Sequence, residues 1–349
     1  MKTFGYAARV STAPRKAPVI ADVARVAGVS VPTVSRVLTG AVPVSPERRE
    51  RVLAAIRELG FRPNGAARAL VRGQQSMVAV LTSNTTRYGY GMTLQGIEEA
   101  ARQAGYLVVI SVVETPDRAT VAAAVDSMLG QPMAGAVVLE YDPAGAAALA
   151  AVPPWLPVVA AAPVPGGETS PGVPHAYMDD HAAAVQATRY LLDLGHRTVH
   201  HVGIPSTGGP SARTLGWREA LEAAGAPVPA VVAADWAPTS GYDAGLALAE
   251  DPDVTAVLCG NDEIAMGVMK ALADRGRRVP EDVSVIGFDD HPLAQLWSPS
   301  LTTVRQDFAA LGRQAFALLT ASMQDGPPPR SITARPELVL RGTSGPPPR

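Results

Sequence analysis

The feature that most constrains the fold is an alternation of short apolar runs and amphipathic helices that begins at Met77. Runs typical of buried strands alternate with segments whose apolar residues recur at helical spacing. This order predicts parallel sheets joined by right-handed crossover helices. The expected strands are Met77–Leu81, Leu107–Val112, Gly135–Leu139, Val158–Ala161, Thr198–Val202, Ala256–Cys259 and Val283–Phe288. The expected helices are Leu94–Ala104, Ala119–Leu129, Ala182–Leu194, Leu215–Ala224, Gly241–Leu248, Ala265–Arg275 and Phe308–Met323.

The number of these elements fits two similar halves better than one sheet. Ligands of such sheets bind outside the carboxyl ends of the strands, which predicts a binding cleft between the halves. A chain of 349 residues is long enough for these two halves and a further small domain.

The residues before Met77 follow a different pattern. Residues 19–27 place apolar side chains on one face of a short helix, and Gly28 can end it in a left-handed conformation. Ser30 can cap a second helix, and Ser45 opens a third. Three short helices with a tight glycine turn predict a small all-α head.

Charge is distributed unevenly between these two parts. Residues 1–73 hold 13 Lys and Arg against 4 Asp and Glu, a net charge of +9, whereas residues 74–349 hold 17 against 28, a net charge of −11. A basic head on an acidic body is expected when only the head meets a polyanion. The alternative is a flexible basic tail without a partner. Residues 1–17 lack periodicity and are expected to form a disordered basic tail.

Several classes of protein are excluded by what the sequence lacks. Cys259 is the one cysteine, so an internal disulfide and a multi-cysteine metal site are excluded, and no cofactor is expected. No apolar run approaches the roughly 18 residues of a membrane span, and no signal peptide is evident, which predicts a cytoplasmic protein. An enzyme is not expected, because the sequence has no Walker A, GxSxG, GxGxxG or HExxH motif. A secreted solute-binding protein would leave residues 19–73 unexplained.

Five stretches together resemble bacterial transcriptional regulators of the LacI/GalR family. They are "VARVAGVSVPTVSRVLTG", "RPNGAARALVRG", "NDEIAMGVMKAL", "VPEDVSVIGFDD" and "SPSLTTVRQD". The resemblance implies a helix-turn-helix DNA-binding head in residues 18–62, a hinge helix in 63–73, and an effector-binding and dimerisation domain in 74–349. That domain would be two-lobed and periplasmic-binding-protein-like. Its lobe 1 is expected at about 74–177 and 306–333, and its lobe 2 at about 178–305 and 334–342.

The second helix of such a head enters the DNA major groove with its N-terminal part. Arg36 could then bind a guanine with two hydrogen bonds, although it could also be a solvated surface charge. The resemblance places Val31 and Pro32 at positions that vary specificity. The hydroxyl groups suited to phosphate contacts belong to Ser30, Thr33 and Ser35.

The chain differs from the family at two positions, one in the head and one in the effector site, and matches it at the hinge. Val19 stands where relatives have a Thr or Ser, so a helix cap and a phosphate contact are expected to be missing. Leu70 matches the hinge residue that is wedged into the minor groove, flanked by Asn64 and Ala67. Ala162 replaces a polar pocket residue of some relatives, which alters the expected pattern of hydroxyl contacts.

The resemblance also implies a set of effector-binding residues. Those that align with effector contacts of sugar-responsive relatives are Arg213, Trp236, Asn261 and Asp289. Further candidates from the sequence are Tyr88, Glu140, Tyr177, Gln306 and Phe308. Structural alternatives exist: Arg213 could be an ion-pair partner and Trp236 a loop aromatic. Asp262 is expected to cap the helix that starts at Glu263, with Asp290 as a similar cap.

The sequence therefore predicts a homodimeric repressor of carbohydrate-utilisation genes. A twofold dimer would bind a palindromic DNA operator and release it when a sugar or glycoside binds. The alternative is a regulator of the same family with a non-sugar corepressor such as a purine.

Overall fold

The computed structural model describes residues 18–39, 42–61, 77–163, 172–206, 209–324, 326–327 and 329–349. The chain divides into two compact units, Met1–Gln75 and Ser76–Arg349. The predictions for residues 1–17 and for the hinge, 63–73, fall outside the described residues. None of the helices in the described ranges is both long and apolar enough to cross a membrane.

The first unit packs three described helices around one small core. They are α1 (Ile20–Ala27), α2 (Val31–Thr39) and α3 (Pro46–Leu59). Val23, Val34 and Val52, one from each helix, are fully buried against one another. Gly28 ends α1 with φ 61°, a left-handed conformation that favours glycine and turns the chain into α2.

The start of α1 confirms that the expected side-chain cap is missing. Val19 has no side-chain acceptor, and the carboxylate of Asp22 instead accepts a hydrogen bond from the Val19 N–H at 3.0 Å. Asp22 also pairs with Arg25 at 3.3 Å. Half of a capping box therefore replaces the usual cap.

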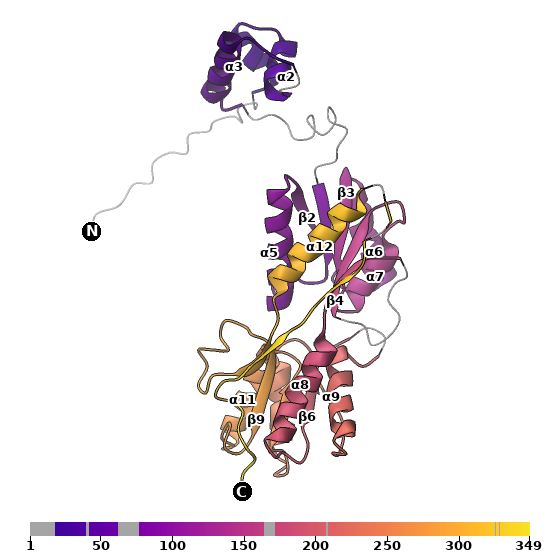
Figure 1. Ribbon diagram of the computed structural model, residues 1–349, viewed down its shortest axis with the longest axis vertical. Coiled ribbons are helices and arrows are strands. Elements are labelled where there is room, and N and C mark those ends of the chain that lie inside the picture. The colour runs from indigo at the N-terminus through magenta and orange to yellow at the C-terminus, as the bar shows by residue number, and fades with distance from the viewer. Residues whose placement is uncertain are drawn as a thin grey trace, which may run out of the picture. The chain divides into compact units, whose positions relative to one another are not determined.

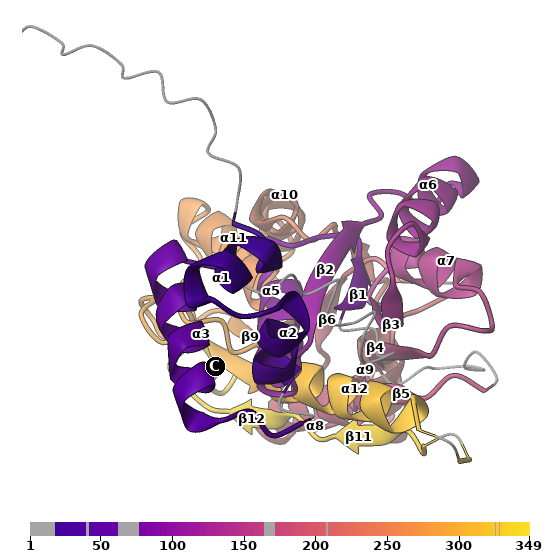
Figure 2. The ribbon, with the colours of Figure 1, turned by 90° about the horizontal axis from the view of Figure 1, so that it is seen from above.

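Lobe 1 of the second unit is a parallel sheet with the strand order β11-β5-β4-β3-β1-β2. Its strands are β1 (Met77–Thr82), β2 (Leu107–Val112), β3 (Met133–Leu139), β4 (Val158–Pro163), β5 (His175–Met178) and β11 (Ile332–Ala334). Helices α5 (Tyr88–Gln103) and α12 (Phe308–Ser322) cover one face, and α6 (Arg118–Leu129) and α7 (Pro143–Ala151) cover the other (Figure 2). Apolar cores fill both faces.

Lobe 2 repeats this plan with the strand order β12-β10-β9-β8-β6-β7. Its strands are β6 (His200–Gly203), β7 (Val232–Ala233), β8 (Ala256–Cys259), β9 (Ser284–Asp289), β10 (Thr302–Arg305) and β12 (Glu337–Val339). Strand β12 is antiparallel to β10, and the other pairs are parallel. Helices α8 (Asp180–Asp193) and α9 (Ala212–Ala223) pack on one face, and α10 (Pro238–Ala249) and α11 (Asp262–Asp274) on the other.

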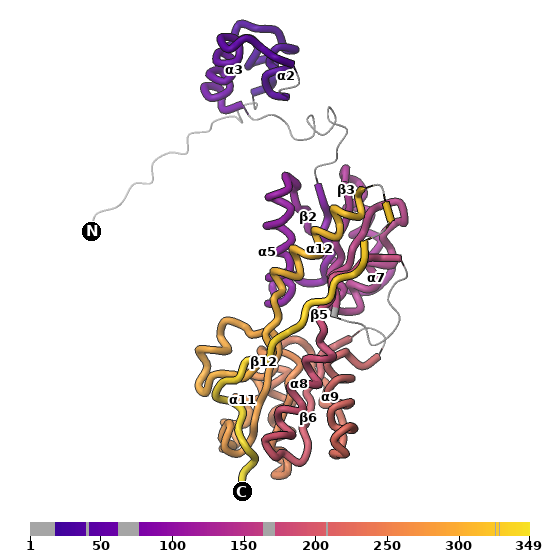
Figure 3. Tube along the Cα trace, in the orientation of Figure 1, coloured from indigo at the N-terminus to yellow at the C-terminus, as the bar shows by residue number. Residues whose placement is uncertain are grey.

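The chain crosses between the two lobes more than once (Figures 1 and 3). It leaves lobe 1 between β5 and α8, returns between β10 and α12, and leaves again between β11 and β12. Each lobe is therefore built from segments that lie far apart in the sequence.

These observations confirm the predicted fold class of a helix-turn-helix head and a two-lobed α/β domain with parallel sheets. Every strand and helix predicted within the described residues is present, with ends that shift by up to about six residues, as at Tyr88, where α5 begins ahead of the predicted Leu94. The sequence reading missed α7, β5, β7, β10, β11 and β12. Helix α7 has the sequence "PAGAAALAA", which contains no contrast of apolar and polar positions, and the missed strands are four residues long or shorter.

Candidate functional site

The first candidate surface is the N-terminal part of α2 in the helical head. Val34 anchors the helix in the core, whereas Ser30, Val31, Pro32 and Arg36 are exposed. The hydroxyl groups of Ser30 and Thr33 share a hydrogen bond of 2.9 Å. This arrangement leaves one face of α2 free to meet a partner.

Arg36 and Ser35 lie one turn further along this helix. The guanidinium of Arg36 makes no ion pair or hydrogen bond within the described residues, and Ser35 is half-buried. An unpaired, exposed guanidinium is free to bind a base edge or a phosphate. The hinge candidates Asn64, Ala67 and Leu70 lie outside the described residues.

The second candidate site lies where the two lobes meet. Side chains that follow the carboxyl ends of strands in both lobes contact one another there, and we call them the interlobe cluster. Its members are Tyr88, Tyr90 and Phe308 from lobe 1 and Arg213, Trp236, Asp289 and His291 from lobe 2.

Arg213 is the buried cation of the interlobe cluster. It is 6% exposed, its Nε donates to Asp180 at 2.8 Å, and a second nitrogen donates to the carbonyl of Gly260. Its guanidinium lies 4.4 Å from the ring centroid of Phe288. Although burial alone would lower it, the carboxylates of Asp180 and Asp289 raise the pKa of Arg213. Arg213 therefore does form an ion pair, as the alternative interpretation of this residue expected.

Asp289 ends β9 in a conformation that is rare for an aspartate, with φ 109°. Its Oδ1 lies 3.5 Å from a guanidinium nitrogen of Arg213. The two atoms are too far apart for a good hydrogen bond. That buried oxygen accepts no hydrogen bond within the described structure. Burial raises the pKa of Asp289 well above its usual range, and Arg213 offsets this only in part. An unsatisfied buried acceptor in a backbone outlier is a feature of functional sites.

Asn261, and not Asp262 as predicted, caps helix α11. Asn261 is the N-cap of α11, and its Oδ1 accepts from the Ile264 N–H at 2.8 Å. Asp262 does not cap this helix, which corrects the prediction. Its carboxylate instead accepts from the Thr303 hydroxyl at 2.5 Å and from the His291 N–H at 2.7 Å. Burial raises the pKa of Asp262 to about 7.

Asp290 is not a helix cap either. It pairs with Arg305 at 2.7 Å and with Arg341 at 2.5 Å. The two arginines come from β10 and from the C-terminal segment, so Asp290 ties that segment to lobe 2.

Aromatic rings from both lobes surround the charged groups. Tyr88 lies 4.8 Å from His291 and 6.1 Å from Phe308, measured between ring centroids. Trp236 lies 6.4 Å from Tyr90 in an edge-to-face arrangement. Burial, followed by the negative charge of Asp289, raises the pKa of Tyr88. Tyr88 thus contacts Phe308 directly, whereas Trp236 contacts the lobe 1 rings through Tyr90, and the predicted role of all three in effector binding stays a prediction.

Three tyrosine and histidine residues at this site were missed by the sequence reading: Tyr90, Tyr141 and His291. Tyr141 donates or accepts a hydrogen bond of 2.7 Å with Thr93, and its ring lies 5.0 Å from that of Tyr90. Their positions in the sequence could have indicated them, because each lies just after a predicted strand or within one helical turn of a candidate residue.

Glu140 and Tyr177 form a separate group with His175. The ring of Tyr177 stacks on His175 at 4.9 Å, and Nε2 of His175 lies 3.4 Å from Oε2 of Glu140. Gln306 lies closer to the interlobe cluster, because its Nε2 donates to Asp180 at 2.9 Å in the segment that returns to lobe 1.

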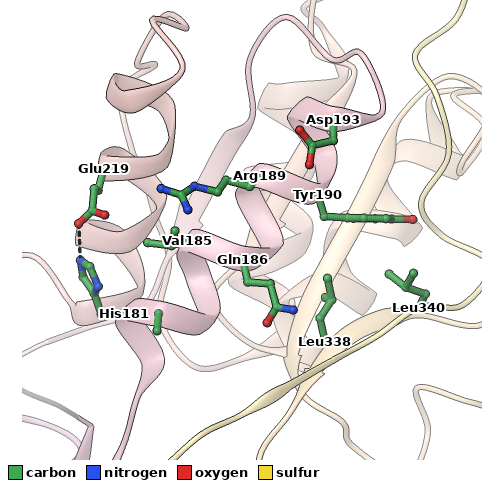
Figure 4. Close-up of a pocket in the computed structure, with 10 residues that line it drawn as sticks. His181, Val185, Gln186, Arg189, Tyr190, Asp193, Glu219, Leu338 and Leu340 are labelled. Atoms are coloured by element: carbon green, nitrogen blue, oxygen red, sulfur yellow. Dashed lines mark ion pairs between the residues drawn. The ribbon is translucent and has the colours of Figure 1, made fainter.

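Lobe 2 also carries a surface pocket between α8, α9 and the C-terminal chain (Figure 4). His181 pairs with Glu219 at its rim at 3.2 Å, and Leu338 and Leu340 supply apolar lining. None of the predicted effector residues lines this pocket.

Comparison with known proteins assigns a family to each of the two parts of the chain. Residues 19–64 match the description "Bacterial regulatory proteins, lacI family", and residues 188–344 match "Periplasmic binding protein-like domain". The chain is 32% identical to catabolite control protein A of Priestia megaterium over 325 residues, which covers 92% of this chain and 97% of the relative. It is 32% identical to the lactose operon repressor of Escherichia coli (strain K12) over 297 residues, covering 84% and 81%.

Two further similarities concern the effector and the structure. The chain is 32% identical over 332 residues to the HTH-type transcriptional repressor PurR of Escherichia coli O139:H28, covering 92% and 95%. The Lac repressor dimer bound to operator and the anti-inducer ONPF superimposes with a TM-score of 0.84 at 30% identity, covering 95% of this chain and all of that one. A complex of the transcriptional regulator CelR with cellobiose gives 0.68 at 30% identity, covering 93% and 99%.

The helical head and the two-lobed domain together define a DNA-binding transcriptional regulator, and not an enzyme. Its relatives over nearly the whole chain are regulators of the same architecture. The chain belongs to the LacI family of bacterial regulatory proteins.

Proposed function

We propose that this regulator is a repressor that releases a palindromic operator when a sugar or glycoside binds at the interlobe cluster. The observation that carries this proposal is Oδ1 of Asp289, a buried acceptor without a hydrogen bond beside Arg213. A ligand hydroxyl would satisfy it. Since the target is DNA, we infer that the protein acts in the cytoplasm, at the nucleoid.

The aromatic rings favour a sugar as the class of effector. A pyranose ring has an apolar face of C–H groups and an edge of hydroxyl groups. Trp236 and Phe308 can cover the apolar face, while Asp289, Arg213 and Asn261 can bind the hydroxyls. Ala162 offers no polar contact, so the hydroxyl that some relatives bind there would be unrecognised.

A purine corepressor is the second candidate, favoured by the similarity to PurR. Aromatic rings can also stack on a nucleobase, and the two classes therefore differ mainly in their polar contacts. An unsatisfied carboxylate oxygen needs a donor, which both an amine and a hydroxyl can supply. The class of effector also sets its effect on DNA binding, because a corepressor strengthens operator binding whereas an inducer weakens it.

In the head, we propose that Arg36 binds a guanine in each operator half-site and that Val31 and Pro32 contact base edges. Ser30, Thr33 and Ser35 would bind phosphates. Support comes from the exposure of Ser30, Val31, Pro32 and Arg36, whereas Thr33 and Ser35 are half-buried. Leu70, with Asn64 and Ala67, would widen the minor groove at the centre of the operator.

We propose a homodimer, because a palindrome requires a twofold pair of heads. Two exposed apolar surfaces support it. Edge strand β2 exposes Leu107 by 65%, and the loop after β9 exposes Leu296 by 76% beside Trp297. Exposed apolar side chains next to an unpaired strand edge are typical of interfaces.

The test begins with a thermal-shift screen of saccharides, glycosides and purines. Each compound that stabilises the protein is then added to a complex with an operator selected from a random DNA pool. A saccharide that weakens the complex supports the proposal, and a purine that strengthens it replaces the proposal with the second candidate.

A further inference from the structure

A polar pocket lies in lobe 1 beside the interlobe cluster. Its volume is about 390 Å³, and it is lined by the carboxyl ends of β3, β1 and β2, which are neighbours in the sheet. The lining residues are Ser83, Asn84, Thr85, Thr86, Arg87, Val112, Glu114 and Asp142. This volume falls at the lower end of the range for small-molecule sites, which suits one ring of a larger ligand.

Asp142 is the buried polar centre of this pocket. It is 8% exposed, and its Oδ2 accepts hydrogen bonds from the Tyr90 hydroxyl at 2.7 Å and from the Ser83 hydroxyl. Its Oδ1 accepts from the Gly145 N–H at 3.0 Å and so caps α7. Because three donors hold this carboxylate, its position is fixed before any ligand binds.

The chemistry of the lining indicates an uncharged ligand rich in hydroxyl groups. Arg87 and Glu114 carry opposite charges, and neither forms an ion pair within the described residues. Together with Asp142 they give a net negative lining, which disfavours an anion. Val112 is the one apolar side chain of the lining, too little to cover the face of a purine.

The backbone turn before α5 adds hydroxyl and amide groups. Oδ1 of Asn84 accepts from the N–H groups of Thr86 and Arg87, both at 2.8 Å. The Thr86 hydroxyl also donates to Oδ1 of Asn84 at 3.1 Å. These bonds fix the turn, so that the Asn84 Nδ2 group and the Thr85 hydroxyl remain to bind a ligand. Such a surface matches a sugar ring, whose hydroxyls both donate and accept.

Two lining residues, Arg87 and Asp142, contact members of the interlobe cluster. The guanidinium of Arg87 lies 5.2 Å from the Trp236 ring and 5.9 Å from the Tyr90 ring, measured to the centroids. Tyr90 in turn binds Asp142. Arg87 therefore lines the lobe 1 pocket while it contacts lobe 2.

We infer that this pocket is a second carbohydrate subsite, so that the effector contains at least two sugar units. One unit would stack at Trp236 in the interlobe cluster, and the next would lie in the pocket against Arg87 and Glu114. This inference rests on the proposed function and specifies the minimum size of the effector. It also makes Arg87 a contact between the second unit and lobe 2.

Calorimetry with the full-length protein tests the inference. The probes are glucose, galactose and xylose, the disaccharides cellobiose, maltose, lactose and xylobiose, and adenine, guanine and hypoxanthine. We expect one disaccharide to bind at least about tenfold more tightly than its own monosaccharide, because the second unit adds hydrogen bonds to charged groups. Glu114→Ala should weaken that disaccharide by about fivefold to tenfold and leave the monosaccharide unchanged. Arg87→Ala should also weaken the disaccharide by about fivefold to tenfold, but because its guanidinium contacts the Trp236 ring, this variant is not used to judge monosaccharide binding.

Glu222→Ala, on the exposed surface of α9, is the matched control and should bind like the wild type. A monosaccharide that binds as tightly as its disaccharide overturns the subsite, as does unchanged disaccharide binding in both pocket variants. In either case the sugar-responsive repressor survives. Binding of a purine base, without any saccharide, would overturn the proposed function itself.

Discussion

Asp289 and Arg213 lie next to each other in lobe 2, with Oδ1 of Asp289 3.5 Å from a guanidinium nitrogen of Arg213, yet that oxygen accepts no hydrogen bond from any described residue. Arg213 is committed elsewhere, to Asp180 at 2.8 Å and to the Gly260 carbonyl. The pair thus leaves one buried acceptor unsatisfied at the carboxyl end of β9. Such a group destabilises the free protein and stabilises a complex with a ligand that donates a hydrogen bond.

Asp289→Asn should therefore stabilise the ligand-free protein at neutral pH. The raised pKa means that the folded state holds this proton more tightly than the unfolded chain does. The penalty is thus absent below the unfolded carboxyl pKa, about 3.9, grows as pH rises above that value and levels off above the raised pKa. We expect a gain in unfolding free energy at pH 7 that shrinks toward zero near pH 4.

Chemical denaturation at pH 4, 5.5 and 7 measures this gain. Asp193→Asn, an exposed carboxylate on α8, is the control and should change stability little. A gain that is equal at all three pH values would contradict the assigned cause.

Arg36→Ala should weaken specific operator binding by about 1–3 kcal/mol per half-site and leave the fold intact. The reason is that Arg36 is exposed on α2 and unpaired, whereas Val34 anchors the helix. Affinity for the selected operator and for random DNA is measured side by side. Arg57→Ala, which removes a charge from α3 instead, controls for the loss of one positive charge. An equal loss on both DNAs would mean that Arg36 only contacts phosphate.

Leu70→Ala should reduce both operator affinity and operator bending, because an apolar wedge would be lost from the central base step. Gly65→Ala should strengthen binding by up to about 1 kcal/mol, since alanine favours a helix that forms on DNA. Amide hydrogen exchange of residues 63–73, measured with and without operator, tests whether the hinge folds on DNA. Equal protection of residues 63–73 in both states would rule out a hinge that folds on DNA.

Thr343→Val should destabilise lobe 2 by about 1–3 kcal/mol, because it leaves two buried backbone groups unpaired. Thr343 is fully buried in the C-terminal segment, donates to the Val285 carbonyl at 2.6 Å and accepts from the Thr302 N–H at 2.8 Å. Thermal unfolding compares it with Thr320→Val, whose hydroxyl bonds only within the exposed face of α12. Similar unfolding of the two variants would show that the C-terminal segment adds little stability.

The fold was predictable where apolar contrast is strong. Strand β8, "AVLC", and helix α11 carry clear patterns, and both lie where expected. Helix α7 and β10 could not be found, since alanine runs have no polar face and "TTVR" is stabilised by its neighbours β9 and β12 rather than by its own sequence.

The site was predictable in part, because the candidates follow strand ends that parallel sheets bring to one edge. Trp236, Arg213 and Asp289 lie in the interlobe cluster as expected, although their proposed contacts with an effector remain predictions. The predicted cap of α11 was wrong by one residue. Asn261 and Asp262 are both good caps, and the carboxylate of Asp262 binds the Thr303 hydroxyl and the His291 N–H instead. Glu140 was expected among the effector contacts, but its described partner is His175, an association across 35 residues that no local pattern encodes.

The most direct test of the account is operator affinity measured by fluorescence anisotropy, with and without the saccharide that binds best, for the wild type and Asp289→Ala. A ligand can shift DNA binding only by its different affinity for two states, typically about 1–3 kcal/mol, or about 5-fold to 150-fold. The account predicts that the saccharide weakens wild-type binding by such a factor, whereas Asp289→Ala binds the operator normally and does not respond. An equal response in Asp289→Ala, or an effector that strengthens operator binding, would contradict it.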